Sequence, residues 1–352
     1  MRPSTLTQHP GFARMFQPDR LTLGLMQPMT PLINGVPDMA GQLALAARAD
    51  ALGFAALWVR DVPLFDPEFN DAGQIYDPWV WLGQLAAVTR RIALSSAGIV
   101  LPLRHPLHTA KAAASVDAVS GGRFLLGAAS GDRASEYPAF DRSHASRGEA
   151  YREYIEVIRR STSEDYPELS GTFGSLRNLD LLPKATGGHL PLLAVGSAQQ
   201  SLQWIARHLD GWVTYFRPLE QQRPRIDTWN RTVQSIAEGT FLPFTESMFI
   251  DLAEDPDTAP SPIFLGYRLG RHRLVEELTA FAKAGVHHVA FNLRHSTRPA
   301  DEVIQELAEF VLPSFPSLPP TTSRPQTSDE CQNISSDGTA SGLTHPQKTD
   351  AS

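Results

Sequence analysis

Eight short apolar segments recur along this chain, and helical patterns lie between them. They span residues 21–25, 54–59, 92–100, 124–128, 192–195, 211–216, 247–252 and 288–293. Most are continuous apolar runs rather than alternating ones, which is typical of parallel strands buried on both faces. Eight such strand-helix units in one chain favour a closed (β/α)8 barrel, the TIM-barrel architecture, over an open doubly wound sheet.

Composition divides the chain into three parts. Residues 1–20 contain several proline and glycine residues, and we expect them to form a flexible N-terminal arm. Residues 21–315 hold the barrel, and the polar, proline-rich composition of residues 316–352 predicts a disordered tail. Two stretches, 132–146 and 217–246, break the strand-helix rhythm. Because long irregular segments of a compact domain are usually functional loops, we expect 217–246 to act as a lid.

The charge and the cysteine content exclude several classes of protein. The 352 residues carry a formal charge of -7 and no basic cluster, which argues against nucleic-acid binding. The single cysteine, Cys331, excludes a disulfide framework and a cysteine-rich metal site. No apolar stretch follows Arg2, and no window is apolar enough to span a bilayer. We therefore expect no secretory signal, no membrane contact and a cytoplasmic location.

Three of the predicted strand ends carry residues suited to binding phosphate, which favours free backbone N–H groups, helix N-termini and arginine. They are Ser130 with Gly131, Arg147 at the start of a predicted helix, and the segment Gly196, Ser197, Ala198, Gln199 and Gln200, which is expected to open a helix. Each of them alone is equally compatible with an ordinary turn or helix cap. Together, in one repeating β/α chain, they favour a phosphate site.

Small residues lie at the end of the third predicted strand, in the run Ser95, Ser96, Ala97 and Gly98. Small side chains there leave room for a flat ring against the backbone. Packing against a bulky core neighbour would require the same residues, so both explanations stay open.

Charged residues follow several predicted strands. Arg60 and Asp61 end the second strand, Arg268 and Arg271 precede the last long helix, and Asn292 and Arg294 close the eighth strand. Charged groups at the C-terminal ends of barrel strands are typical of active sites. Surface ion pairs are the alternative, and they are common.

Other catalytic motifs are absent from the sequence. His105, His108, His287 and His288 lack metal-ligand spacing with carboxylates, so we interpret them as structural and expect no metal. The sequence contains no G-x-S-x-G elbow, P-loop or nicotinamide-binding fingerprint.

Several segments resemble the bacterial luciferase-like monooxygenase family. The Leu-Pro-x-x-His-Pro motif at 101–106 and the Ser-Gly-Gly-Arg-Phe motif at 120–124 carry much of the resemblance. The runs 147–154 and 193–201 extend it, and it covers about residues 20–315. The segments 60–64, 71–79 and 266–271 are similar to one subgroup, the luciferase-type oxidoreductases.

The resemblance implies a (β/α)8 barrel with an insertion near the seventh strand, which we expect in 217–246. It implies FMN, or the deazaflavin coenzyme, at the C-terminal mouth of the barrel. Ser130 and Gly131 then lie near the cofactor phosphate, Arg147 binds it, and Ser197 and Gln200 contact it. Ala97 and Gly98 fall where family members often hold a cis peptide against the flavin ring.

The resemblance also implies partners. Since no nicotinamide fingerprint is present, a separate flavin reductase is expected to supply reduced flavin. A homodimer is expected through helix 78–89, which carries Trp79, Trp81 and Leu82.

One departure affects the chemistry. Luciferase itself has a histidine after the second strand, whereas this chain has Arg60, Asp61 and Val62. Light emission is therefore not implied, and Asp61 becomes the candidate catalytic acid or base. Arg60, Arg268 and Arg271 are the candidates for orienting a polar or anionic substrate.

We interpret the sequence as a flavin-dependent oxidoreductase, a monooxygenase that uses reduced FMN and O2 on a small organic substrate. The alternatives are a deazaflavin-dependent hydride-transfer dehydrogenase and a non-catalytic flavin-binding barrel. The sequence does not identify the substrate.

Overall fold

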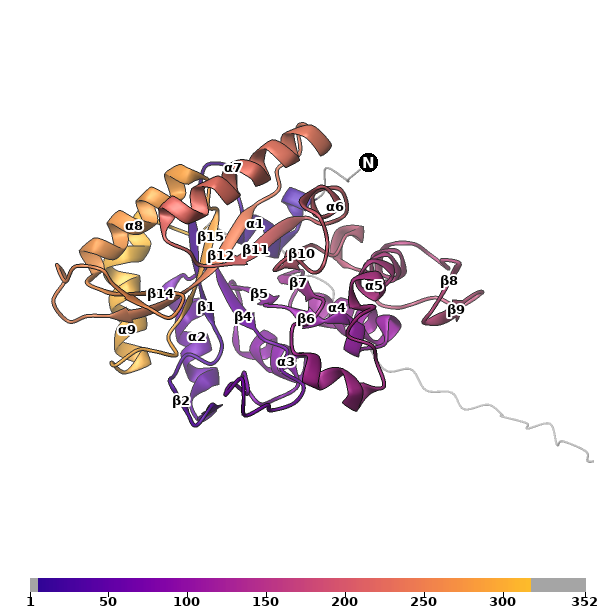
Figure 1. Cartoon of the computed structure of the whole chain (residues 1–352), viewed down its shortest axis with the longest axis horizontal. Coiled ribbons are helices and arrows are strands. Elements are labelled where there is room, and N and C mark those ends of the chain that lie inside the picture. The colour runs from indigo at the N-terminus through magenta and orange to yellow at the C-terminus, as the bar shows by residue number, and fades with distance from the viewer. Residues whose placement is uncertain (1–5, 318–352) are drawn as a thin grey trace, which may run out of the picture. The chain divides into compact units, whose positions relative to one another are not determined.

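The computed structural model describes residues 6–317. In it, eight parallel strands close into a barrel at the centre of the molecule (Figure 1). In order around the barrel they are β1 (Thr22–Met26), β4 (Ala56–Val59), β5 (Ala93–Ser96), β7 (Phe124–Ala129), β10 (Leu192–Val195), β11 (Gly211–Tyr215), β12 (Phe244–Leu252) and β15 (His288–Asn292). Parallel pairing of β15 with both β12 and β1 closes the ring, so the predicted (β/α)8 barrel is confirmed.

Helices follow the strands and surround the barrel (Figure 1). They are α2 (Gln42–Leu52), α3 (Pro78–Val88), α4 (Pro106–Val119), α5 (Arg147–Ser163), α6 (Leu202–His208), α7 (Leu219–Ile236), α8 (Arg271–Ala284) and α9 (Ala300–Glu306). Local chemistry sets their ends. Asp77 caps α3 by accepting the Trp79 amide at 2.9 Å, and Pro78 follows at the first helical position. Gly53 ends α2 in the left-handed conformation that glycine adopts at little cost.

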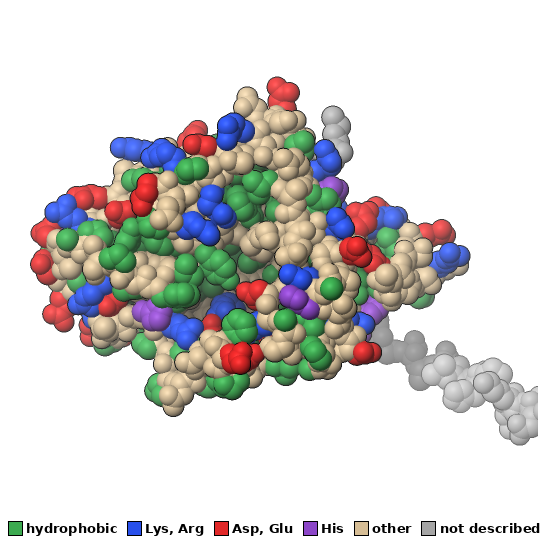
Figure 2. All heavy atoms as spheres, viewed as in Figure 1, with side chains coloured by type: hydrophobic (Ala, Val, Ile, Leu, Met, Phe, Trp, Pro, Cys, Tyr) green, Lys and Arg blue, Asp and Glu red, His purple; other side chains and the backbone are tan. Residues whose placement is uncertain are grey.

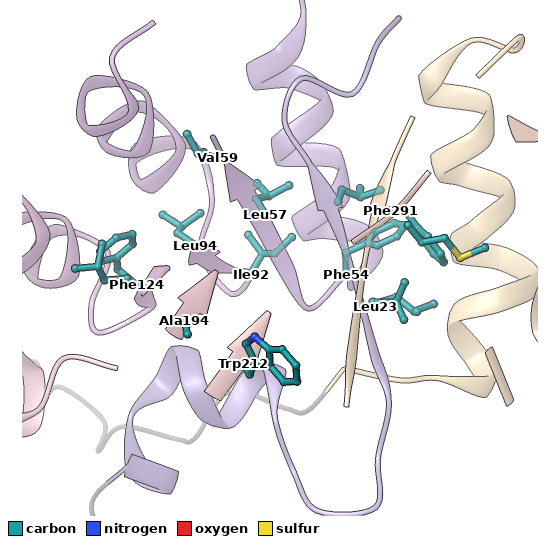
Figure 3. Packing of buried hydrophobic residues seen from close by; sticks show 14 of the residues in the cluster. Leu23, Phe54, Leu57, Val59, Ile92, Leu94, Phe124, Ala194, Trp212 and Phe291 are labelled. Carbon is teal, nitrogen blue, oxygen red and sulfur yellow. The ribbon is translucent and has the colours of Figure 1, made fainter. Parts of the chain in front are cut away.

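Two apolar layers hold the barrel together because side chains alternate along each strand. On β4, Leu57 and Val59 point outward and join the cluster between strands and helices (Figure 3). Ala56 and Trp58 point inward and join the cluster inside the barrel. Burial on both faces explains why these strands are continuous apolar runs in the sequence.

The N-terminal segment closes one end of the barrel, which corrects the expectation of a flexible arm over residues 1–20. From Leu6 onward it forms a short 3-10 helix, η1 (Leu6–Gln8), and helix α1 (Pro10–Met15). Phe12, Met15 and Phe16 are buried in the cluster inside the barrel.

The proline and glycine of this segment serve packing rather than disorder. Pro10 begins α1 behind the capping His9 ring. A Cβ atom on Gly11 would lie 2.5 Å from the Arg123 carbonyl oxygen, so only glycine permits the close approach to β7. The predicted tail, 316–352, lies outside the described residues from 318 onward.

The segment 217–246 is not an irregular lid, and that prediction is wrong. It contains α7, an ordinary barrel helix between β11 and β12, and it buries Gln222, Ile226 and Trp229 at helical spacing. The additional structure lies after the seventh barrel strand, where β13 (Ser261–Ile263) and β14 (Gly266–Leu269) form a hairpin. Its strand β14 pairs parallel with β12.

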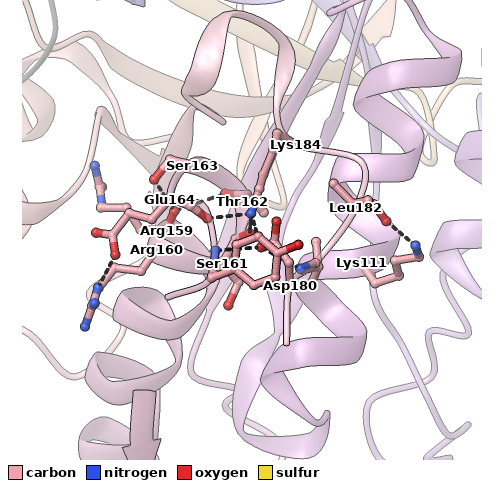
Figure 4. A network of polar contacts seen from close by, with 12 residues as sticks. Lys111, Arg159, Arg160, Ser161, Thr162, Ser163, Glu164, Asp180, Leu182 and Lys184 are labelled. Carbon is pink, nitrogen blue, oxygen red and sulfur yellow. Dashed lines mark hydrogen bonds and ion pairs between the residues drawn. The ribbon is translucent and has the colours of Figure 1, made fainter. Parts of the chain in front are cut away.

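A second excursion, which the sequence analysis missed, joins α5 to β10. It contains the hairpin of β8 (Leu169–Gly171) and β9 (Gly174–Leu176). A polar network fixes its return to the barrel (Figure 4). Lys184 pairs with Asp180 and donates to the Ser161 carbonyl near the end of α5, and Lys111 of α4 donates to the Leu182 carbonyl. Cations are favourable at the carbonyl end of a helix.

Among residues 6–317, no helix combines the length and the apolar character needed to cross a membrane.

Candidate functional site

The barrel is filled at one end and open at the other. Trp58 and His288 are fully buried near the end that α1 covers. Toward the C-terminal ends of the strands, Ala97, Val195 and Ser247 are only half-buried although they belong to the barrel strands or follow them directly. The barrel interior is therefore not filled there, and its walls are made of small side chains. Figure 2 shows hydrophobic side chains over the barrel strands, with basic, acidic and histidine side chains close beside them.

A cis peptide joins Ala97 to Gly98 at this open end, which confirms the expectation from the resemblance. Atoms of the neighbouring strands β7 and β10 crowd it closely. A Cβ atom on Gly98 would lie 2.8 Å from Val195 Cγ2 and 3.0 Å from the Gly127 carbonyl oxygen. The hydroxyls of Ser95 and Ser96 are used inside the sheet, donating to the Leu125 and Gly127 carbonyls at 3.0 and 2.8 Å. The small residues at this strand end therefore let three strands approach one another.

Two of the three predicted phosphate segments lie in contact with each other. The Gln200 side chain donates from Nε2 to the Gly148 carbonyl at 2.8 Å and to the Ala198 carbonyl at 3.0 Å. A Cβ atom on Gly148 would lie 2.9 Å from Gln199 Cβ. The start of α5 and the turn after β10 therefore form one surface.

Tyr137 and His144 link the third segment to this surface. Tyr137 follows β7 and donates its hydroxyl to the Ser130 carbonyl. Its ring lies 4.9 Å, centroid to centroid, from the ring of His144. Arg147 in turn donates from Nη1 to the His144 carbonyl at 2.6 Å. Ser130, Arg147 and residues 196–200 thus lie along one continuous set of contacts, which we call the cradle.

The cradle contains donors that lack acceptors. Arg147 Nε and His144 Nε2 are buried and have no hydrogen-bond partner among the described residues. A buried polar atom without a partner costs free energy, so an anion in contact with Arg147 would relieve it. Burial and the Arg147 guanidinium both lower the pKa of His144, against the opposing charge of Asp132. Burial raises the pKa of Tyr137 to about 12, against the opposing influence of Arg147.

The structure corrects the expected conformation of residues 196–200. They do not open a helix, because α6 begins only at Leu202 with Ser201 as its cap. Gly196, Ala198 and Gln199 instead form a turn with φ values of 68°, 47° and 59°. Turns with left-handed residues can direct successive N–H groups toward one point and so bind anions. The phosphate expectation therefore depends on a turn rather than on a helix terminus.

A cluster of charges occupies the other side of the open end, and we call it the arginine cluster. Arg60 and Arg294, which follow β4 and β15, both pair with Asp71 Oδ2, the latter at 3.1 Å. Arg133 donates to the Asp71 backbone carbonyl at 3.2 Å and lies over the Phe69 ring. Burial alone would raise the pKa of Asp71, but the charge and hydrogen bond of Arg60 hold it below its usual value.

Tyr215, the last residue of β11, faces the same space. Its side chain is 55% exposed, yet the loss of surrounding water raises its pKa, and the charge of Asp132 adds to this effect. Arg60 and Arg133 act on the phenol in the opposite direction. Tyr215 is therefore within electrostatic reach of the arginine cluster from the far side of the barrel.

Asp61 does not fit the predicted role of catalytic acid or base. Its Oδ2 accepts from Arg104 Nε at 2.9 Å and from the Val100 amide at 3.0 Å, and its Oδ1 accepts from Arg104 Nη2 at 2.8 Å. With both oxygens engaged and the side chain fully buried, Asp61 fixes the chain after β5.

Two of the three predicted substrate arginines are likewise occupied elsewhere. Arg268 pairs with Asp251 of β12 and contacts Thr297. Arg271 pairs with Glu306 of α9 at 2.9 Å and lies over the Phe310 ring, within the outer helix layer. Only Arg60 of the three belongs to the arginine cluster.

Five residues of the open end were not predicted from the sequence: Asp71, Arg133, Tyr137, His144 and Tyr215. Tyr215 could have been found, because it lies near the end of the predicted strand 211–216 and on the same, inward face as Val213. The other four come from the connections between strands and helices, and no local pattern indicates where those connections fold. No group of three or more His, Cys, Asp or Glu side chains in residues 6–317 could hold a metal ion.

Comparison with known proteins gives a consistent result. The sequence model described as luciferase-like monooxygenase matches residues 16–288. An uncharacterized protein of Mycobacterium tuberculosis is 35% identical over 199 residues, which cover 51% of this chain and 70% of that protein. The alkanal monooxygenase alpha chain of Photorhabdus luminescens is 22% identical over 206 residues, or 58% of this chain and 56% of that one.

Solved structures share the fold. An F420-dependent secondary alcohol dehydrogenase superposes with a TM-score of 0.68 at 17% identity, covering 84% of this chain and 99% of that one. The oxygenating constituent of 3,6-diketocamphane monooxygenase from Pseudomonas putida, in complex with FMN, gives 0.66 at 14% identity, covering 84% and 100%. At these identities the likeness establishes the barrel fold alone.

Proposed function

The chain belongs to the luciferase-like monooxygenase family, and from this membership we propose that it is a flavin-dependent oxidoreductase acting on paired donors. Specifically, it is a monooxygenase that uses reduced FMN and O2 on a small organic substrate. The observation that carries the proposal is the cradle. Three chain segments suited to phosphate meet at the open end of the barrel, and there Arg147 Nε is buried without an acceptor.

The residues present fit FMN. Arg147 and the turn 196–200 would hold the phosphate, and Ser130 and Gly131 would line it. The flavin ring would lie against Ala97 and Gly98, where half-buried small side chains leave the barrel open. Bound flavin supplies the redox chemistry, in which reduced flavin delivers electrons to O2. The protein would contribute orientation, through Arg147 and the turn 196–200 at the phosphate and through the barrel wall at the ring.

Partners and location remain part of the proposal. A separate reductase supplies reduced flavin, and the protein acts in the cytoplasm as a homodimer. The aromatic side chains of α3, from which the dimer contact was expected, are not available for it in the structure. Trp81 and Leu82 are buried in the core, and Trp79 packs against Phe124, so the aromatic surface is used within the chain. The large apolar residues that α3 exposes are Val80, at 65%, and Val88, at 37%.

A fluorescence titration tests the proposal. The purified protein is titrated with oxidised FMN, reduced FMN and the deazaflavin coenzyme, and the Arg147→Ala variant is measured beside it. We expect tight FMN binding, strongest for the reduced form, that weakens in the variant. Preference for the deazaflavin would favour a dehydrogenase that transfers hydride over a monooxygenase that uses O2. Binding of FMN without oxygen consumption by the reduced form would leave a non-catalytic flavin-binding barrel, and binding of neither cofactor would refute the proposal.

A further inference from the structure

We propose that the substrate carries a carboxylate and that Arg60 and Arg294 bind it at the open end of the barrel. The inference rests on the proposed function, because it places a substrate beside the flavin. It goes further by assigning the chemical class of the substrate and two specificity-determining residues.

The first argument is charge. Arg60 and Arg294 pair with the same oxygen of a single carboxylate, that of Asp71, so two guanidinium charges face one negative charge. Arg133 donates to the backbone carbonyl of Asp71 but also lies within electrostatic reach of the carboxylates of Asp66 and Glu136, so its charge is compensated separately. Asp132 is the other acidic residue within electrostatic reach of Tyr215, and it is exposed. Arg60 and Arg294 together therefore carry one positive charge that Asp71 does not neutralise and that an anion would neutralise.

The second argument is unused hydrogen-bonding capacity. Each guanidinium offers five N–H donors. Among the described residues, the Arg60 guanidinium bonds only to Asp71, while that of Arg294 contacts Asp71 and donates from Nη2 to the Asn70 carbonyl at 2.8 Å. Their side chains are 27% and 23% exposed. Several donors of both residues are thus available to a ligand that enters the barrel.

The third argument is position. Arg60 follows β4 and Arg294 follows β15, the second and eighth strands of the barrel, whereas the cradle follows β7 and β10, the fourth and fifth. Arg60 and Arg294 therefore form an anion site separate from the phosphate site, although Arg133 of the cluster comes from the loop after β7 that also carries Ser130. Half-buried Ala97, which follows β5, lies on the wall between them, and the substrate would bind between the flavin ring proposed to cover this wall and the two arginines.

The group that fits is a carboxylate. Asp71 already shows how these guanidiniums hold a carboxylate oxygen, and the planar guanidinium fork matches carboxylate geometry. Arg268 and Arg271 do not offer an equivalent site, because each is already paired with a carboxylate of its own, Asp251 or Glu306.

Calorimetric titration of the full chain tests the inference, with and without saturating FMN. The probes are hexanoate, the neutral hexanamide of the same shape, and hexanesulfonate. We expect hexanoate to bind about tenfold or more tightly than hexanamide, the difference expected for one charge-assisted contact, and to weaken with added salt. Arg60→Gln and Arg294→Gln should each remove this preference. Arg268→Gln is the matched control and should keep it.

Each other outcome has a defined meaning. Equal binding of hexanoate and hexanamide, or no hexanoate binding at all, overturns the inference. So does retention of the preference in both arginine variants. Tighter binding of hexanesulfonate than of hexanoate overturns the choice of carboxylate. FMN affinity measured in the same samples reports on the proposed function separately, because the arginine variants leave the cradle intact. Melting temperatures exclude global unfolding of the variants.

Discussion

Glu246→Gln should stabilise the protein, and the gain should grow with pH. Glu246 lies on β12 but points outward, toward α7, and its side chain is fully buried. Its Oε2 accepts from Gln222 Nε2 at 2.6 Å, and its Oε1 has no partner among the described residues. No cation pairs with it there. Burial therefore raises its pKa from 4.5 to about 8, although the Gln222 hydrogen bond acts in the opposite direction.

The sign of the effect follows from proton binding. Because the folded-state pKa lies above the unfolded value of 4.5, the folded protein keeps a proton that the unfolded chain releases. The free energy of unfolding therefore falls as the pH rises from about 4.5 to about 8, by about 1.4 kcal/mol for each pH unit. Over the whole window the loss is on the order of 4–5 kcal/mol, and it is constant above pH 8. Glutamine stays neutral and removes this loss.

Urea unfolding measured between pH 5 and pH 8.5 provides the assay. The difference in free energy of unfolding between Glu246→Gln and the native chain should be small at pH 5 and should widen up to about pH 8. Glu238→Gln, at an exposed position after α7, is the matched control and should follow the native chain throughout. Parallel curves for Glu246→Gln and the native chain would show that Glu246 is solvated or paired and would refute the reasoning.

Three further outcomes can be measured. Arg147→Ala should weaken FMN binding by about 1.5–3 kcal/mol, as a lost charge-assisted contact does, and unchanged affinity in a flavin titration would remove Arg147 from the site. Phe12→Ala should lower the free energy of unfolding by about 3–5 kcal/mol, because the ring is fully buried in the barrel interior. A loss of less than about 1 kcal/mol would show that the N-terminal segment does not stabilise the barrel. Asp61→Asn should lower the melting temperature, because Asp61 fixes Arg104 and the Val100 amide, while FMN affinity per folded molecule should stay the same. Loss of turnover without loss of stability would instead support a catalytic role for Asp61.

The barrel strands could be predicted because both of their faces are buried, which leaves a continuous apolar run in the sequence. The same logic failed for α7. Its first turns contain Pro224, and its exposed face is strongly charged, so the segment looked irregular. Its buried residues nevertheless follow helical spacing, and that spacing would have predicted the helix. The N-terminal segment was misjudged because Pro10 and Gly11 also occur in flexible chains, and only the closeness of β7 shows what they do.

The site could be predicted where the strand itself decides the position. Arg60 and the Ala97–Gly98 peptide follow directly after strands. Because the C-terminal ends of all barrel strands lie at the same end of the barrel, their position at the open end follows from the sequence. Asp71 and Arg133 come from loops, and their meeting with Arg60 depends on how distant parts of the chain fold together. The roles expected of Arg268 and Arg271 failed for the same reason, since their partners Asp251 and Glu306 are 17 and 35 residues away.

The filled end of the barrel explains why the N-terminal segment is part of the domain. His288 lies inside the barrel, and burial lowers its pKa to about 3, so the ring stays neutral near pH 7. The Trp58 indole can only donate, and it does so to His288 Nε2 at 3.0 Å. The proton of the neutral ring therefore sits on Nδ1 and is donated to Thr22 Oγ1 at 2.8 Å.

Thr22 completes this chain of hydrogen bonds. Its hydroxyl donates to the Met15 carbonyl at 2.7 Å, so the direction of every bond from Trp58 to α1 is fixed. A polar chain in which every member is satisfied holds the N-terminal helix on the barrel floor with a defined orientation. Because the barrel is closed and stabilised at this end, its interior does not have to be filled at the C-terminal ends of the strands. The cradle and the arginine cluster both lie at that open end.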